Sequence, residues 1–94
     1  MFFRETRLVR NPRVVWNVIE DETILLDREE GEAIRLNSVA GAIWTSLEKA
    51  RTMEEVVQDI IILFDADPQQ VGRDVRRFLK KMLRQEILLK EGRT

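Results

Sequence analysis

GEAIRLNSVAGAIW, residues Gly31–Trp44, passes from a strand pattern to a helix pattern without a loop between the two. Glu32–Leu36 has the alternation that is typical of a half-buried strand. Asn37 or Ser38 then supplies a short side-chain oxygen that can cap the first turn of a helix. We therefore predict a strand that leads directly into a helix.

The alternation places Ile34 and Leu36 towards the core and Ala33 and Arg35 outward. The edge of such a strand matters, because unpaired N–H and C=O groups can accept another chain as an added strand. This edge is the first candidate for a binding site.

Two more strands are predicted upstream, at Val14–Ile19 and Thr23–Leu26, and polar turns bound both of them. The second turn ends at Gly31, which can adopt a positive φ. Three short strands joined by tight turns predict an antiparallel meander. Val14–Ile19 is apolar on both faces, so we expect one face to meet the helices and the other to be only partly covered.

The hydrophobic period becomes helical after Asn37, and we predict helices at about Ser38–Lys49, Met53–Phe64 and Pro68–Gln85. Gly41, inside the first helix, is either a point of close approach by another backbone or a tolerated surface glycine.

The second and third helices each begin at a cap. Thr52 and Glu55 form a capping box, and Asp67 precedes Pro68 at the first helical position. Ile87–Leu89 then predicts either a short final strand or a packed tail.

The third helix has two distinct faces. Its apolar stripe consists of Val71, Val75, Phe78, Leu79 and Met82. Its polar side carries Arg73, Arg76, Arg77, Lys80, Lys81 and Arg84.

The predicted fold class is α+β: a winged-helix-like domain in which a three-stranded antiparallel sheet is followed by three helices. Residues 14–90 would form this domain, and residues 1–13 would form an N-terminal arm. Phe2 and Phe3 in the arm either dock on the domain or serve self-association.

Composition excludes several classes of function. The chain has 94 residues, no Cys, no His and a formal net charge of −1. Disulfides, thiolate nucleophiles and the usual zinc ligands are therefore absent, and we expect no metal and no cofactor. The sequence has neither a signal peptide nor a membrane span, which predicts a cytoplasmic protein without a membrane partner.

Catalysis is not expected. The 17 carboxylates make neighbouring pairs unavoidable, and the adjacent ones fall in turns or at a helix start, where solvation or capping explains them. The Ser and Thr hydroxyls have no imidazole to activate them.

The basic side of the third helix is the one feature that suggests nucleic acid, because a helix-turn-helix inserts its second helix into the major groove. The slightly acidic chain argues against this, and charged residues opposite an apolar stripe are expected in any case. A further alternative is a structural subunit that dimerises through the strand edge.

Peptide capture is the function that the pattern favours. If the third helix lies beside the edge of Glu32–Leu36, a peptide could add there as a fourth strand. Phe78, Met82 and Leu36 would supply apolar surface, with Arg35, Asp74, Arg77 and Lys81 at the rim. Phe78 and Met82 could equally be ordinary core residues.

An ordered set of short motifs resembles the PqqD-like family of peptide-recognition domains. The set comprises Arg35-Leu36-Asn37, Ala40 to Trp44, Arg51-Thr52 with Glu55, Asp74-Val75, Phe78-Leu79 and Ile87-Leu88. The resemblance covers about residues 14–90.

The resemblance implies a non-catalytic protein that binds the leader segment of a ribosomally made precursor peptide and presents it to a separate processing enzyme. That enzyme would be the leader peptidase of a lasso-peptide pathway, which we favour, or the radical SAM enzyme of pyrroloquinoline quinone (PQQ) biosynthesis. The leader would add beside the third strand and pack on the third helix. The peptide-binding residues would be Glu32, Ala33, Ile34, Arg35, Leu36, Val71, Asp74, Val75, Phe78 and Met82, with Arg77 and Lys81 added because they flank the stripe.

Overall fold

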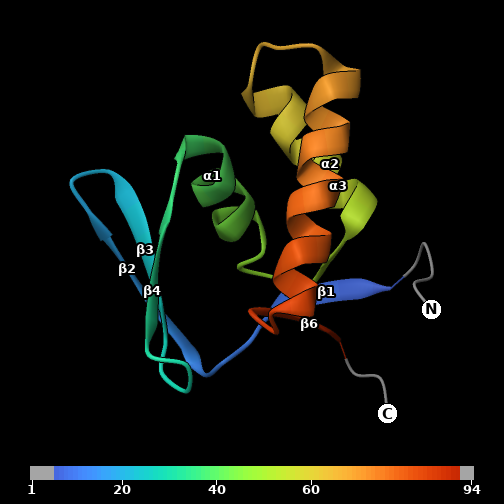
Figure 1. Ribbon diagram of the computed structural model, residues 1–94. Helices are drawn as coiled ribbons and strands as arrows, with labels where there is room; N and C mark the ends of the chain where they lie inside the picture. Colours follow the sequence, from blue (N-terminus) through green and yellow to red (C-terminus); the bar gives the residue numbers. More distant parts are fainter. Residues whose placement is uncertain (1–5, 92–94) are drawn as a thin grey trace.

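The computed structural model describes residues 6–91, which form two small sheets and three helices (Figure 1). In chain order these are β1 (Arg7–Arg10), β2 (Val14–Ile19), β3 (Glu22–Asp27), β4 (Glu32–Leu36), α1 (Ser38–Ser46), β5 (Arg51–Thr52), α2 (Met53–Leu63), α3 (Pro68–Arg84) and β6 (Leu88–Lys90). In Figure 1, α1 lies between the β2–β3–β4 sheet and the α2–α3 pair.

The predicted meander is confirmed as the antiparallel sheet β2–β3–β4. Glu20 and Asp21 turn the chain between β2 and β3 with φ of 52° and 68°. Gly31 precedes β4 with φ of 72°, as its place in the turn suggested. Within residues 6–91, β4 pairs only with β3, so its other edge is open.

The predicted order of three strands followed by three helices is incomplete, because a second sheet runs β5–β1–β6. Its middle strand is Arg7–Arg10, which we had assigned to an N-terminal arm, and Leu8 in that strand is fully buried. The winged-helix-like description is not confirmed for the same reason. Phe2 and Phe3 lie outside the described residues.

The helices begin where their caps predict. Asn37 caps α1 by accepting from the Ala40 N–H at 2.8 Å, and Thr52 caps α2 in a complete capping box. Asp67 caps α3. The first helix ends at Ser46, earlier than predicted.

Gly41 marks a close approach of α1 to the meander. A Cβ there would lie 3.2 Å from the Thr23 Oγ1 atom of β3. The neighbour is thus a side chain and not the backbone that we expected, and Gly41 is partly buried rather than a surface glycine.

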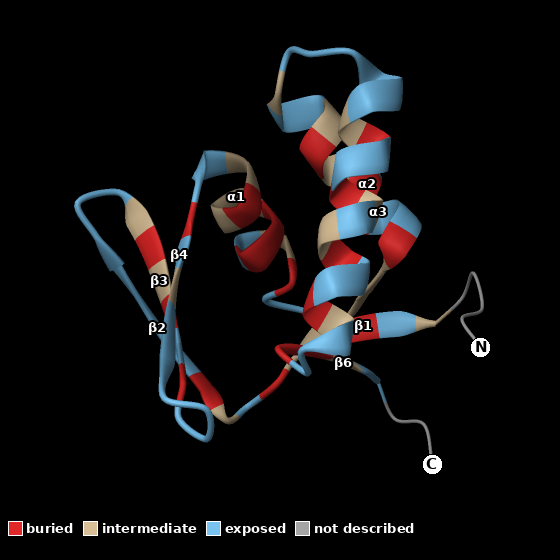
Figure 2. Ribbon diagram, viewed as in Figure 1, coloured by how far each residue is buried: buried red, intermediate tan, exposed pale blue. Residues whose placement is uncertain are grey.

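The core lies between the helices and the β5–β1–β6 sheet and also includes Leu25 of β3 and Leu36 of β4, whereas most of β2 is exposed (Figure 2). Val14 is the one buried residue of β2; Trp16 is 46% exposed although its ring meets Trp44 of α1. Our expectation that one face of this strand would be covered by helices is wrong for most of its length. The meander is therefore attached to α1 mainly through β3 and β4.

Candidate functional site

A groove of about 490 Å³ separates β4 from α3, and α1 forms its floor. Thirteen residues line it. They are Glu32, Ile34, Arg35 and Leu36 from β4; Asn37, Val39, Ala40 and Ile43 from the start of α1; and Asp74, Phe78, Lys81, Met82 and Gln85 from α3 and its C-cap.

The strand wall combines an open backbone edge with apolar side chains. Leu36 is buried and Ile34 is partly buried, because both point towards α1 as the alternation predicted. The open edge carries backbone donors and acceptors that an extended chain can pair with. This wall can therefore bind a backbone and an apolar side chain together.

The helix wall is made by residues three or four positions apart, which lie on one face of α3. Phe78 is partly buried and Met82 is almost fully buried, so both pack on the core and also reach the groove. Asp74 and Lys81 are exposed beside them. The Asp74 carboxylate accepts from Gln70 at 3.0 Å and lies 3.5 Å from the Arg77 guanidinium.

Charges of both signs border the groove. The exposed Arg35 guanidinium pairs with Glu22 of β3 at 2.7 Å. The hydrogen bond from Arg35 holds the pKa of Glu22 below its ordinary value. Within residues 6–91, no cluster of three or more acidic, His or Cys side chains could hold a metal ion.

The structure brings most of the predicted binding residues together. Glu32, Ile34, Arg35, Leu36, Asp74, Phe78, Lys81 and Met82 all line the groove. The other four predicted residues do not. Ala33 is exposed on the opposite face of the sheet, Val71 is partly buried, Val75 is buried in the core, and Arg77 is exposed beside Asp74.

The prediction missed the floor of the groove and one end of the helix wall. Five residues line the groove but were not predicted as binding residues: Asn37, Val39, Ala40, Ile43 and Gln85. A signal for the floor was available: Val39 and Ile43 lie one helical turn apart, directly after the strand that forms one wall.

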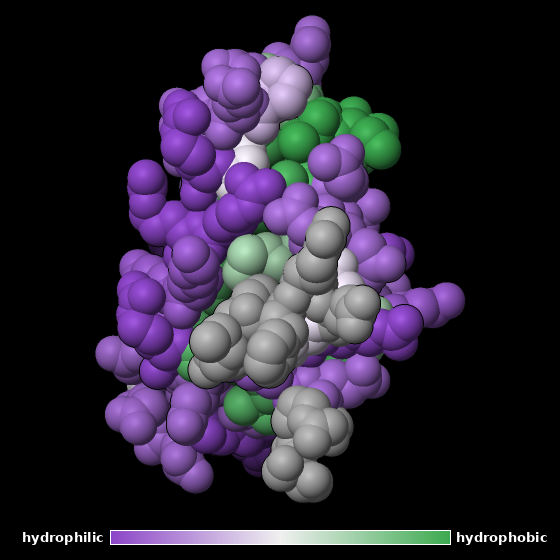
Figure 3. Space-filling model, turned by 90° about the vertical axis from the view of Figure 1, so that its right-hand side faces the viewer, coloured by the Kyte–Doolittle hydropathy of each residue, from purple (hydrophilic) through white to green (hydrophobic). Residues whose placement is uncertain are grey.

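The described part of the chain contains no helix long and apolar enough to span a bilayer. The exterior seen in Figure 3 is mostly hydrophilic, with hydrophobic surface limited to small areas.

Residues 22–88 match the model of the family described as coenzyme PQQ synthesis protein D, PqqD. The matched range runs from β3 to the start of β6 and contains every element that lines the groove. The chain belongs to the PqqD family. The resemblance stated from the sequence is thereby confirmed.

Two relatives of this PqqD-family chain are described by what they bind. The structure of TbiB1 in complex with the TbiA(β) leader peptide is 32% identical, with a TM-score of 0.75 over 92% of this chain and 98% of TbiB1. The PqqA binding protein of Rhizobium meliloti (strain 1021) is 28% identical over 76 residues, which cover 81% of this chain and 76% of that protein.

Two further structures share the fold at 20% identity. The first is lasso peptide synthetase B1 complexed with the leader peptide, with a TM-score of 0.74 over 87% of this chain and 96% of the other. The second is the PqqD part of Methylobacterium extorquens PqqCD, with a TM-score of 0.72 over 95% of each chain. It is described as a functional and stand-alone RiPP recognition element. This likeness shows that both structures share the fold of this chain.

Proposed function

We propose that this chain is a non-catalytic recognition protein that binds the leader segment of a ribosomally synthesised precursor peptide as an added β-strand. The observation that carries the proposal is the open edge of β4, which forms one wall of a groove with α3 as the other wall. The leader complex of TbiB1, a 32% identical relative, supports it.

The two walls of the groove would make different contributions to peptide binding. The backbone of Glu32–Leu36 would pair with the peptide backbone and provide affinity for any extended chain. Ile34, Phe78 and Met82 would receive apolar peptide side chains and provide selectivity. Asp74 and Lys81 would act at the rim.

The four predicted residues outside the groove would contribute differently. Ala33 would contribute backbone groups, and Arg77 would act through Asp74, which it contacts. Val75 and Val71 would support the helix wall through packing, because Val75 is buried and Val71 packs against the core.

We further propose that the bound leader is delivered to a separate processing enzyme in the cytoplasm. The leader peptidase of a lasso-peptide pathway remains the favoured partner, because the long β2–β3–β4 hairpin region suggested that pathway. The PqqA binding relative keeps the radical SAM enzyme of PQQ biosynthesis as the alternative.

The test is a titration with a labelled leader peptide, encoded beside the gene for this chain, followed by single N-methylation along the peptide. N-methylation removes one backbone donor at a time without changing the protein. Strand addition predicts that affinity falls at every second peptide position, because alternate N–H groups face β4. Loss of affinity without this alternation would contradict strand addition.

The same titration at two salt concentrations separates the alternatives. A leader held by backbone pairing and apolar contacts should show little salt dependence, whereas phosphate contacts weaken steeply as salt rises. Salt-sensitive binding of duplex DNA without peptide binding would instead make the basic side of α3 the functional surface.

A further inference from the structure

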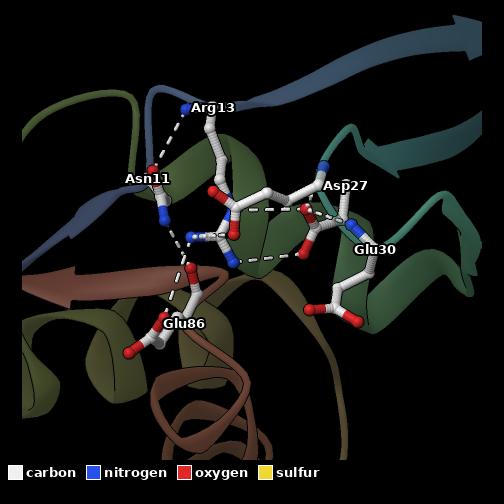
Figure 4. Close-up of polar contacts among 6 residues, drawn as sticks. Asn11, Arg13, Asp27, Glu30 and Glu86 are labelled. Atoms are coloured by element: carbon white, nitrogen blue, oxygen red, sulfur yellow. Dashed lines mark hydrogen bonds and ion pairs between the residues drawn. The ribbon is translucent and has the colours of Figure 1, made fainter.

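The two walls of the groove belong to different parts of the fold. β4 is held in the β2–β3–β4 sheet, whereas α3 packs on α2 and on β6. At the Leu36 end of the groove, Asn37 joins β4 directly to α1, which forms the floor. At the Glu32 end, residues 11–13 cross between the two parts (Figure 4).

Arg13 makes the crossing contacts on the sheet side. Its Nε and NH2 groups lie 3.2 and 3.3 Å from the two carboxylate oxygens of Asp27, the last residue of β3. The Asp27 side chain is 5% exposed, and it also accepts from the Glu29 and Glu30 N–H groups of the turn before β4. One carboxylate therefore holds both Arg13 and the turn.

The same segment is anchored to the end of α3. The Arg13 NH1 group lies 3.7 Å from the Glu86 carboxylate. Buried Asn11 donates from its side chain to the Glu86 carbonyl at 2.7 Å and from its backbone to the Ile87 carbonyl at 3.0 Å. Its side-chain oxygen accepts from the Arg13 N–H at 3.0 Å, so Asn11 links Arg13 to Glu86 and Ile87, which directly follow α3 and its C-cap.

These anchors are adjacent to the groove. Asp27 is paired directly with Glu32 in the strand register, and Glu86 follows Gln85 in the chain. Glu32 and Gln85 both line the groove, one on each wall. Both also line the polar cleft that contains Arg13 and Asp27, so the groove and the cleft share this end.

We propose that Arg13 is a positioning residue that sets the separation of β4 and α3 at the Glu32–Gln85 end of the groove, and so sets the affinity for a strand added there. The role rests on the proposed function. A two-pronged Arg–carboxylate contact fixes direction as well as distance, which a single charge contact does not. Walls held at the correct spacing before binding reduce the ordering cost of binding. The hydrogen bond from Arg13 also lowers the pKa of Asp27 below its ordinary value.

The wall separation can be measured without any peptide. The chain has no Cys, so Arg28→Cys in the turn before β4 and Lys80→Cys on α3 give two specific spin-label sites, both exposed and outside the groove lining. Pulsed EPR then reports the distance distribution between sheet and helix. Arg13→Gln is predicted to broaden it, Arg13→Lys to broaden it less, and Glu86→Gln, which spares the Asp27 contact, to have the smallest effect.

The matched control is Arg76→Gln. Arg76 also joins two elements through a carboxylate, Glu54 of α2, at 3.0 Å, but it does not line the groove. This variant should leave the distribution unchanged. Thermal melting of each variant, followed by Trp fluorescence, establishes that it is folded.

Leader affinity completes the test. In the folded Arg13→Gln variant we expect affinity to fall by about tenfold through faster dissociation, the size of a modest loss of preorganisation. A distribution as narrow as the wild type's in folded Arg13→Gln, or an unchanged dissociation rate, would overturn the positioning role. A wild-type protein that binds no leader would instead overturn the proposed function, whatever the EPR distances show.

Discussion

The sheet β2–β3–β4 has two edge strands, and only one of them borders a groove. β4 lies across from α3, and four of its five residues line the space between them. β2 lies at the opposite edge, and none of its residues lines that space. Both edge strands offer backbone groups. The difference is that α3 lies opposite the edge of β4 and forms a second wall there.

The side chains of the two strands differ in a second respect. β4 carries Glu32 and Arg35, whereas β2, VVWNVI, carries no charge. Four apolar residues of β2, Val15, Trp16, Val18 and Ile19, are between 40% and 56% exposed. Charge on an edge strand discourages unwanted pairing, and β2 lacks that protection. An open strand edge can therefore pair with unrelated chains. A second wall opposite the edge restricts which chains can bind there.

The largest effect on leader affinity is expected at the helix wall, which β4 faces and β2 does not. Phe78→Ala removes the aromatic ring that faces β4 across the groove and should weaken leader binding by about 1–3 kcal/mol. Isothermal titration calorimetry measures the change. Val18→Ala on β2 is the control and should bind as the wild type does; equal losses in both variants would remove the distinction between the two edges.

The next largest effect is expected on the stability of the fold, at the contacts that attach β2 to α1. The Arg10 guanidinium lies 4.9 Å from the Trp16 ring centroid and 4.7 Å from that of Trp44, and its Nε donates to the Trp44 carbonyl at 3.0 Å. Arg10→Gln should lower the free energy of unfolding by about 1–2 kcal/mol, because it removes the ring contacts and the hydrogen bonds that the Arg10 Nε and NH2 groups donate to the Trp44 carbonyl. Urea unfolding measures this, with exposed Arg73→Gln as the control; equal stability of the two variants would contradict the account.

The contact between Arg13 and Asp27, at the end of β3, should make the stability of the fold depend on pH. Arg13 lowers the pKa of Asp27 below its ordinary 3.8 through a hydrogen bond, so the bond stabilises the fold above that value. The stabilisation is lost as the pH falls through the lower, folded-state pKa. Asp27→Asn should therefore reduce the loss of stability that the wild type shows on acidification from pH 5 to pH 2. Urea midpoints across that range test it; identical slopes for the variant and the wild type would be inconsistent with the contact.

The smallest effect on leader affinity is expected from a substitution that adds a charge to β2. Val18→Lys should change leader affinity by less than about 0.5 kcal/mol, because Val18 is 51% exposed and lies outside the groove. Any self-association of the wild type through the β2 edge should decrease, which sedimentation velocity measures. A clear loss of leader binding would show that β2, too, takes part.

The local parts of the fold could be predicted because their signals are local. The turns at Glu20-Asp21 and Gly31, the Thr52 capping box and the stripe of α3 each depend on residues close together in sequence. The opposition of β4 and α3 followed from the edge argument and from the resemblance to the family. Together these located both walls of the groove.

The second sheet could not be predicted in the same way. Its middle strand, Arg7–Arg10, contains two arginines in four residues and pairs with segments more than forty residues away. One partner is the two-residue strand Arg51–Thr52, where Thr52 also serves as a helix cap. Pairing between distant short segments leaves no periodic signal, and the contacts of Arg10 and Arg13 were missed for the same reason.

Amide hydrogen exchange with and without the leader peptide tests strand addition at β4 most directly. The account predicts that peptide slows exchange at alternate amides of Glu32–Leu36, since every second N–H faces the open edge, and leaves Val14–Ile19 unchanged. New protection along Val14–Ile19, or none along Glu32–Leu36 when the peptide is bound, would contradict it.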